Sequence, residues 1–199
     1  MNSHLSEPAV DIELLALDLT TCTRCVGTLE NIEKAIGAVR PALEATGTRV
    51  TVTKRVITSD EQARRHRFVT SPTVRINGRD IVIETLESSC DSCTDLCGCD
   101  EGISCRVWPY RGQEYMEAPV GLLVEALLRE LVGDSGANAG TSGPYEVPEN
   151  LRRYFAGKVA TMSPDSEPCC APAELASCCD PVEKAGCCEA PAPTTCGCR

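Results

Sequence analysis

The apolar residues of the first 50 positions follow two different periods. Residues 12–19, IELLALDL, form a short apolar run between polar segments, which predicts a buried strand. From Cys22 to Ala45 the apolar residues recur at helical spacing, so a helix is predicted there. Thr20 or Thr21 is suited to cap its start, and Gly47 is suited to end it.

The pattern then changes to that of short strands. Pro41 predicts a kink or the start of a second helical piece, and residues 48–57, TRVTVTKRVI, alternate as a strand does. The segment SDEQARRHR predicts a short helix capped by Ser59. In PTVRINGRDIVIE, Asn77 and Gly78 separate two apolar runs, which predicts a hairpin.

The second half of the chain begins with a cysteine-rich insert. A short strand pair turning at Gly112 is predicted after it, followed by an amphipathic helix over 120–132. The last 39 residues contain too few bulky apolar side chains to form a core. We therefore predict five parts: a flexible N-terminus (1–11), an α/β domain (12–133) with its insert (87–106), a Gly/Ser linker (134–147), a short helix (148–160) and a disordered tail (161–199).

Composition limits the partners and the compartment. The formal charge is −10, which argues against nucleic acid and against an anionic membrane surface. Neither a signal peptide nor a membrane-spanning segment is visible, so a cytoplasmic protein is expected. The cytosol keeps thiols reduced, so the 15 cysteines indicate metal binding or redox chemistry.

The first cysteine pair lies in TTCTRCVG, where the first strand gives way to the first helix. Cys22 would stand at the helix N-terminus, where the helix dipole favours a thiolate, and Cys25 one turn further on. Such a pair can form a disulfide or share a metal ion. Pro72, just before the hairpin, stands where a cis-proline facing the pair is expected.

These features make residues 12–86 resemble the thioredoxin-like fold, an α/β fold with a mixed sheet flanked by helices. The resemblance implies that Cys22 attacks a disulfide, that Cys25 resolves it, and that Pro72 is a cis-proline in the substrate groove. Residues 12–133 also resemble a bacterial thioredoxin-like domain family of unknown function. The rival is a ferredoxin-like metal-transfer domain, which also carries CxxC after its first strand.

The insert CDSCTDLCGCDEGISC has five cysteines in 16 residues. Short spacings of this kind suit tetrahedral thiolate coordination, with zinc as the default ion. Cys90 and Cys93 form the best ligand pair, and two of Cys97, Cys99 and Cys105 could complete the site. Disulfides within the insert and reactive free thiols remain the alternatives.

The tail carries cysteine pairs at a fixed spacing of nine residues, and a repeat with so little else in common cannot fold as a solenoid. Clustered thiolates select soft ions such as Cu(I), Zn(II), As(III) or Hg(II). The tail resembles the cysteine-pair tails of some actinobacterial arsenic-handling enzymes. Its candidate ligands are Cys169, Cys170, Cys178, Cys179, Cys187, Cys188, Cys196 and Cys198.

The sequence therefore predicts a cytoplasmic, thioredoxin-like protein that binds and transfers soft metal or metalloid ions such as As(III), in metal resistance. Zinc or another thiophilic ion is the expected cofactor, and no organic cofactor is expected. The alternative is a thiol–disulfide oxidoreductase that acts through Cys22 and Cys25 on a thiol or disulfide protein partner. A third hypothesis is a metal-stabilised interaction module.

Overall fold

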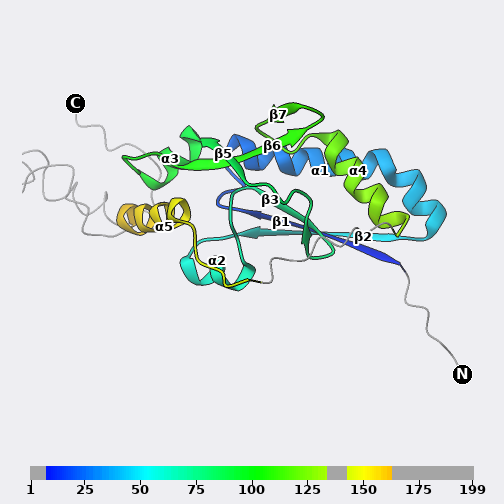
Figure 1. Ribbon diagram of the computed structural model, residues 1–199, viewed down its shortest axis with the longest axis horizontal. Coiled ribbons are helices and arrows are strands. Elements are labelled where there is room, and N and C mark those ends of the chain that lie inside the picture. Colours follow the sequence, from blue (N-terminus) through cyan, green and yellow to red (C-terminus); the bar gives the residue numbers. More distant parts are fainter. Residues whose placement is uncertain (1–7, 134–142, 163–199) are drawn as a thin grey trace, which may run out of the picture. The chain divides into compact units, whose positions relative to one another are not determined.

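The computed structural model describes residues 8–133 and 143–162, and its elements follow the order strand, helix, strand, helix, hairpin that the sequence predicts (Figure 1). The first sheet is mixed and has the strand order β2-β1-β3-β4. Its central strand β1 is parallel to β2 and antiparallel to β3. These strands are β1 (Ala9–Ala16), β2 (Arg49–Val56), β3 (Thr73–Ile76) and β4 (Arg79–Asp80).

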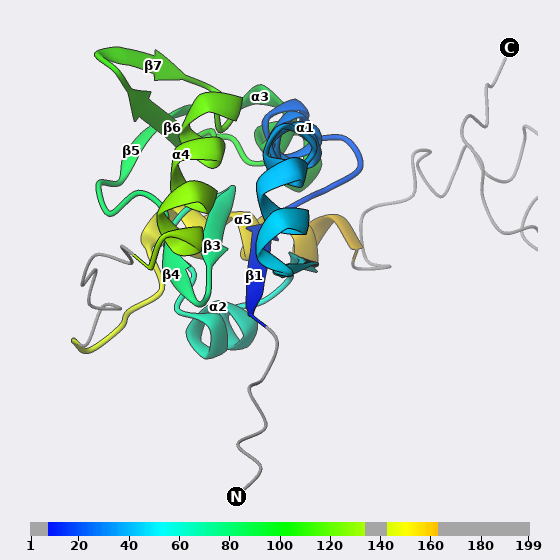
Figure 2. The same cartoon turned by 90° about the vertical axis from the view of Figure 1, so that its right-hand side faces the viewer.

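Helices cover both faces of this sheet (Figures 1 and 2). On one face, alternate β1 residues such as Ile12 and Leu14 pack against α1 (Thr23–Thr46) and α4 (Val120–Leu131). On the other face lie α2 (Asp60–His66) and α5 (Glu149–Met162). The core on this second face contains apolar residues of α5 together with most of the cysteines of the described chain. Its members include Leu15, Ile57, Phe68, Leu151, Tyr154 and Phe155.

The cysteine-rich insert is folded. It contributes a helix and two strands of a second, antiparallel sheet with the order β5-β6-β7. These elements are β5 (Leu86–Ser89), α3 (Asp91–Cys97), β6 (Ser104–Tyr110) and β7 (Gln113–Tyr115).

A buried arginine joins the two sheets. Arg106 on β6 is 1% exposed and forms two bonds of 2.8 Å with the carboxylate of Asp80 on β4. Its backbone N–H donates to the carbonyl of Ser71 at 2.6 Å. Because a buried charge is costly unless it is paired, this ion pair fixes how β6 lies against the first sheet.

Several local predictions are confirmed. Gly47 ends α1 in the left-handed conformation, with φ 63°. Ser59 caps α2 by accepting the backbone N–H of Gln62. Asn77 and Gly78 form the hairpin turn, with φ of 50° and 79°. These signals depend on a few neighbouring residues, so they can be recognised in the sequence alone.

Other predictions about elements were wrong. The first strand spans Ala9–Ala16, three residues earlier than predicted at each end. The helix continues without a break through Pro41, which lies on its exposed side. The carbonyl group of Gly37 that Pro41 leaves without a donor also lies on that exposed side, where water can satisfy it. The N-cap of α1 is Cys22, and its side chain forms no capping hydrogen bond.

The linker segment 134–142 and the tail from residue 163 onwards lie outside the described residues, as does the N-terminus up to residue 7. In the part of the chain that is described, no helix has both the length and the apolar character needed to cross a membrane.

Gly157 in α5 allows a test of how closely this helix packs against the insert, with Gly37 in α1 as the comparison. A Cβ added at Gly157 in α5 would lie 2.6 Å from the Cys97 carbonyl oxygen and 2.7 Å from Cys99 Sγ, whereas one added at Gly37 would have no atom within 4 Å. We expect Gly157→Ala to lower the free energy of unfolding by about 1–3 kcal/mol, the usual cost of overpacking. Gly37→Ala should raise it by about 0.5–1 kcal/mol, because alanine is the better helix former. Urea unfolding of both variants measures this, and equal effects would show that α5 does not pack against the insert.

Candidate metal centre

The loop between β1 and α1 places Cys22. Asp18 accepts the backbone N–H groups of Thr20, Thr21 and Cys22 on a single carboxylate oxygen, at 2.9, 2.5 and 2.8 Å. Burial acts to raise the pKa of Asp18, but these hydrogen bonds outweigh it and the pKa is lowered. The ionised carboxylate therefore folds the loop so that Cys22 begins the helix.

A cysteine also stands at the start of the helix in the insert. Cys90 is the N-cap of α3, and its carbonyl accepts the backbone N–H of Cys93 at 3.2 Å and that of Thr94 at 3.0 Å. The hydroxyl of Thr94 in turn accepts the N–H of Ile103 at 2.8 Å. These bonds close the insert into a compact loop, and its second end continues into β6, which carries Cys105.

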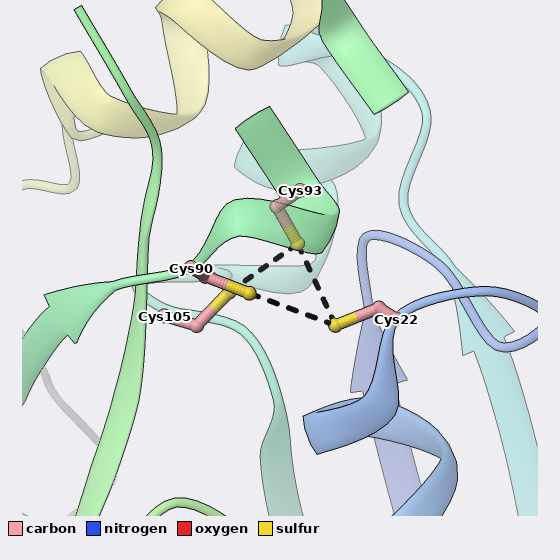
Figure 3. A group of neighbouring side chains, drawn as sticks. All are labelled: Cys22, Cys90, Cys93 and Cys105. Carbon is pink, nitrogen blue, oxygen red and sulfur yellow. Dashed lines mark hydrogen bonds between the residues drawn. The ribbon is translucent and has the colours of Figure 1, made fainter. Parts of the chain in front are cut away.

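Four sulfur atoms from these segments meet in one place (Figure 3). The Sγ atoms of Cys22, Cys90, Cys93 and Cys105 all lie within 4.8 Å of one another. The sulfurs of Cys93 and Cys105 lie 3.3 Å apart. Cys93 lies 3.6 Å from Cys22, and Cys90 lies 4.0 Å from it. A tetrahedral zinc site with metal–sulfur distances of about 2.3 Å needs sulfurs about 3.8 Å apart, so the group has the size of a single-ion site.

The group is shielded from solvent. Cys90 is 4% exposed and the other three cysteines are fully buried. All four are free thiols. Residues of α5, including Leu151 and Tyr154, belong to the same core, and the Tyr154 hydroxyl donates to the carbonyl of Leu17 at 3.3 Å. Helix α5 therefore covers this part of the molecule.

Arg24, between the two cysteines of the first pair, ties α1 to the insert. Its guanidinium donates to the carbonyls of Ser88, Ser89 and Cys105 and to the hydroxyl of Ser88. Ser88 and Ser89 belong to β5, and Cys105 belongs to β6. Arg24 therefore holds the backbone of the insert at the distance from which its sulfurs reach Cys22.

The metal-free thiols share their protons unequally. The pKa of Cys22 is strongly lowered, chiefly because Cys105 donates a hydrogen bond to it, with help from Cys25, Cys90 and Cys93. The pKa of Cys90 is lowered to about 7, mainly by the hydrogen bond from Cys105. The pKa of Cys25 is raised, first by its hydrogen bond to Cys22 and then by burial. The pKa of Cys105 is raised by its hydrogen bonds to Cys22, Cys90 and Cys93, in that order, and then by burial. A thiolate at Cys22 held by neighbouring thiols is ready to bind a soft cation, which would then displace their protons.

Cys25 is the thiol of the first pair that lies outside the group of four. Its sulfur is 3.4 Å from the hydroxyl of Ser71, which also accepts the backbone N–H of Leu17 at 3.0 Å. The Ser71–Pro72 peptide bond is cis, as the resemblance to the thioredoxin-like fold implies for Pro72. Cys25 is fully buried.

Cys97 and Cys99, two of the ligand candidates in the insert, are bonded to each other in a disulfide. Cys99 Sγ also lies 3.6 Å from the carbonyl oxygen of Arg153 on α5. The insert therefore contributes three sulfurs to the group, and the fourth comes from Cys22, 68 residues before Cys90. The eight cysteines of the tail lie outside the described residues.

Sequence reasoning missed three contributions to the site: the loop carboxylate of Asp18, the bridging guanidinium of Arg24 and the membership of Cys22. A signal existed for Asp18, because an aspartate shortly before a helix start is suited to accept backbone N–H groups of the loop that leads into the helix. No local signal existed for the other two, since they depend on how the insert packs against α1.

Comparison with known proteins gives a family but no function. The profile of a family described as a domain of unknown function (DUF2703) matches residues 10–127, which is more than half of the chain. Neither the curated proteins nor the solved structures gave a match.

The bridging role of Arg24 can be tested through metal affinity. Arg24→Gln removes the charge that holds the insert, and we expect zinc affinity to fall by about 10-fold to 100-fold, as is usual for residues that orient ligands. The number of ions bound at saturation should not change. Arg40→Gln, at an exposed position of the same helix, is the matched control. Competition with a zinc chelator measures both, and equal affinities in the two variants would remove Arg24 from the site.

Proposed function

This chain belongs to the DUF2703 family, and we propose that it binds a soft metal or metalloid ion at the four-cysteine group and transfers it to other thiols. The observation that carries the proposal is the meeting of four buried free thiols from three separate segments within 4.8 Å. Packing alone does not require this, because any small apolar residue would fill such positions equally well. An all-thiolate site selects soft ions over magnesium or calcium.

Charge balance bears on which ion is held. Zinc on four thiolates leaves two negative charges in a buried place, which the N-terminus of α1 partly offsets. Arsenic(III) on three thiolates leaves a neutral complex and one spare thiol. Burial favours the neutral complex, since desolvating a charge is costly. We therefore propose As(III) or a similar ion as cargo, and zinc as the ion that occupies the site otherwise.

Transfer needs a thiol that can take over from a ligand. Cys25 lies in the first turn of α1, three residues after Cys22 and outside the group of four, so it is placed to compete for an ion held by Cys22. We propose that the eight tail cysteines capture the ion and that the body accepts it through Cys22 and the insert. The cytoplasmic setting and a role in metal resistance belong to this proposal and rest on the sequence alone.

The second candidate function is thiol–disulfide exchange on a thioredoxin-like fold. The strand order β2-β1-β3-β4, the pair at the start of α1 and the cis bond before Pro72 favour it. The Cys22 thiolate would attack a partner disulfide and release one partner thiolate. Cys25 would then attack the mixed disulfide, so the pair becomes oxidised and the partner fully reduced. The burial of Cys22 weighs against this function, because an attacking thiolate must be reached by its partner.

Serine variants separate the two functions. In a chain ending at Met162, which lacks the tail cysteines, we expect one As(III) or zinc ion per molecule. Replacing Cys90, Cys93 or Cys105 with serine should weaken zinc binding by at least about 10-fold to 100-fold, because each supplies one of four thiolates. Cys25→Ser is the matched control: it should keep zinc binding, whereas an oxidoreductase would lose turnover with it. Titration under reducing conditions and an insulin-reduction assay measure the two activities.

The full chain should bind several more As(III) ions than the chain ending at Met162. Equal capacity would show that the tail does not capture ions. Zinc affinity that stays at the parent's value after the loss of any one of the three insert cysteines would contradict the proposed site.

A further inference from the structure

A second feature of the molecule is unusually rich in arginine, and none of the four cysteines belongs to it. A cavity of about 460 Å³ opens between the end of α2, the strands β3 and β4 and the loop that follows them. This volume is within the range typical of small-molecule sites. The charged residues of its lining are Arg65, Arg67, Arg75, Arg79, Arg106 and Asp80.

The charge of this lining is opposite to that of the chain. The chain has 29 acidic and 19 basic residues, yet the cavity gathers five arginines around one aspartate. Both carboxylate oxygens of that aspartate, Asp80, accept hydrogen bonds from Arg106. The carboxylates that pair with Arg65, Arg75 and Arg79 are not part of the lining. The surface facing the cavity is therefore positive.

Arg67 is the arginine most available to a ligand. Its Nη2 donates to the carbonyl of Gly143 at 2.7 Å, and its guanidinium lies over the ring of Tyr145 at 5.7 Å. Its Nε is buried and has no hydrogen-bond partner within the described part of the chain. A buried donor of this kind costs free energy unless a ligand or water satisfies it.

Arg75 extends the positive surface, and His66 lies beside it in the lining. Arg75 is held by a bond to the carbonyl of Arg67 and by a longer contact of 3.6 Å to Glu13. The pKa of His66 is lowered, first by burial and then by the positive charge of Arg55, with smaller effects from Arg75 and Arg65. The lowered pKa favours the uncharged imidazole, so the positive charge of the lining comes from its arginines.

The rest of the lining is suited to the neutral part of a small molecule. Val69, Val82 and Ile83 provide an apolar wall, and Thr73 and Thr85 add hydroxyl groups. An inorganic anion alone would leave most of 460 Å³ unfilled. The cavity therefore has room for an organic group beside the anionic one.

We propose that this cavity binds a small organic dianion whose charge lies on phosphate or carboxylate oxygens. The planar fork of arginine matches both groups by paired hydrogen bonds. The oxygens would bind Arg67 and Arg75, and the organic part would contact the apolar wall. This site is separate from the four-cysteine group and does not depend on the function proposed for that group.

Calorimetric titration of the full chain tests the proposal, with glycerol 3-phosphate, succinate and inorganic phosphate as probes at constant ionic strength. We expect saturable binding of at least one of the two organic dianions, tighter than that of inorganic phosphate. The stronger organic probe identifies the anionic group. Arg67→Gln should weaken its binding by about 10-fold, the usual effect of losing a charge-assisted hydrogen bond. Zinc stoichiometry should stay unchanged, which separates this result from the metal site.

A second variant guards against misfolding of the first. Ile83 lines the cavity but is 70% exposed, so Ile83→Glu should fold normally and repel a dianion. Val132→Glu, at a position 75% exposed outside the lining, is the matched control and should bind as the parent does. No saturation by either organic probe, or equal binding by the Ile83→Glu and Val132→Glu variants, would overturn the proposal.

Discussion

The contact on which the rest of the structure depends is the meeting of Cys22 with the three cysteines of the insert. It joins the start of α1 on the first sheet to the second sheet and α3, which are far apart in the sequence. The guanidinium of Arg24 and the Arg106–Asp80 ion pair hold the same two parts together by polar bonds. Without an ion, the cluster is a set of thiols around one thiolate, which stabilises the fold only weakly. With an ion, the binding free energy becomes folding free energy, so metal content and stability are coupled.

This arrangement gives Cys22 two uses that exclude each other. As a metal ligand it needs the insert closed over it, and as an attacking thiolate it needs a partner to reach it. Cys25 lies outside the group of four, with its sulfur 3.4 Å from the hydroxyl of Ser71, whose peptide bond to Pro72 is cis. A disulfide between Cys22 and Cys25 would remove one of four ligands, so oxidation of that pair and ion binding compete for the same sulfur.

The sequence predicted the parts of the molecule that depend on neighbouring residues. The Asn77–Gly78 turn, the Ser59 cap and the helix predicted over 120–132 follow from turn chemistry and apolar periodicity. The structure has all three, with the helix at Val120–Leu131. Cysteine spacing correctly singled out Cys90 and Cys93 as neighbours. It could not show that Cys22 joins them while Cys97 bonds to Cys99, because these outcomes depend on how α1, α3 and α5 pack. The helix start was predicted at Cys22 and lies there, but the expected threonine cap was wrong, since the carboxylate of Asp18 accepts the backbone N–H groups of the preceding loop.

The central claim is that four sulfurs of the body of the protein form a site for a single soft ion, all four of them binding when the ion is zinc. X-ray absorption spectroscopy of the zinc-loaded chain ending at Met162 tests it most directly, since that chain lacks the tail thiols. The account predicts four sulfur ligands at about 2.3 Å, falling to three sulfurs and one lighter atom in the Cys22→Ser variant. A coordination sphere dominated by nitrogen or oxygen, or one that the Cys22→Ser change leaves at four sulfurs, would contradict it.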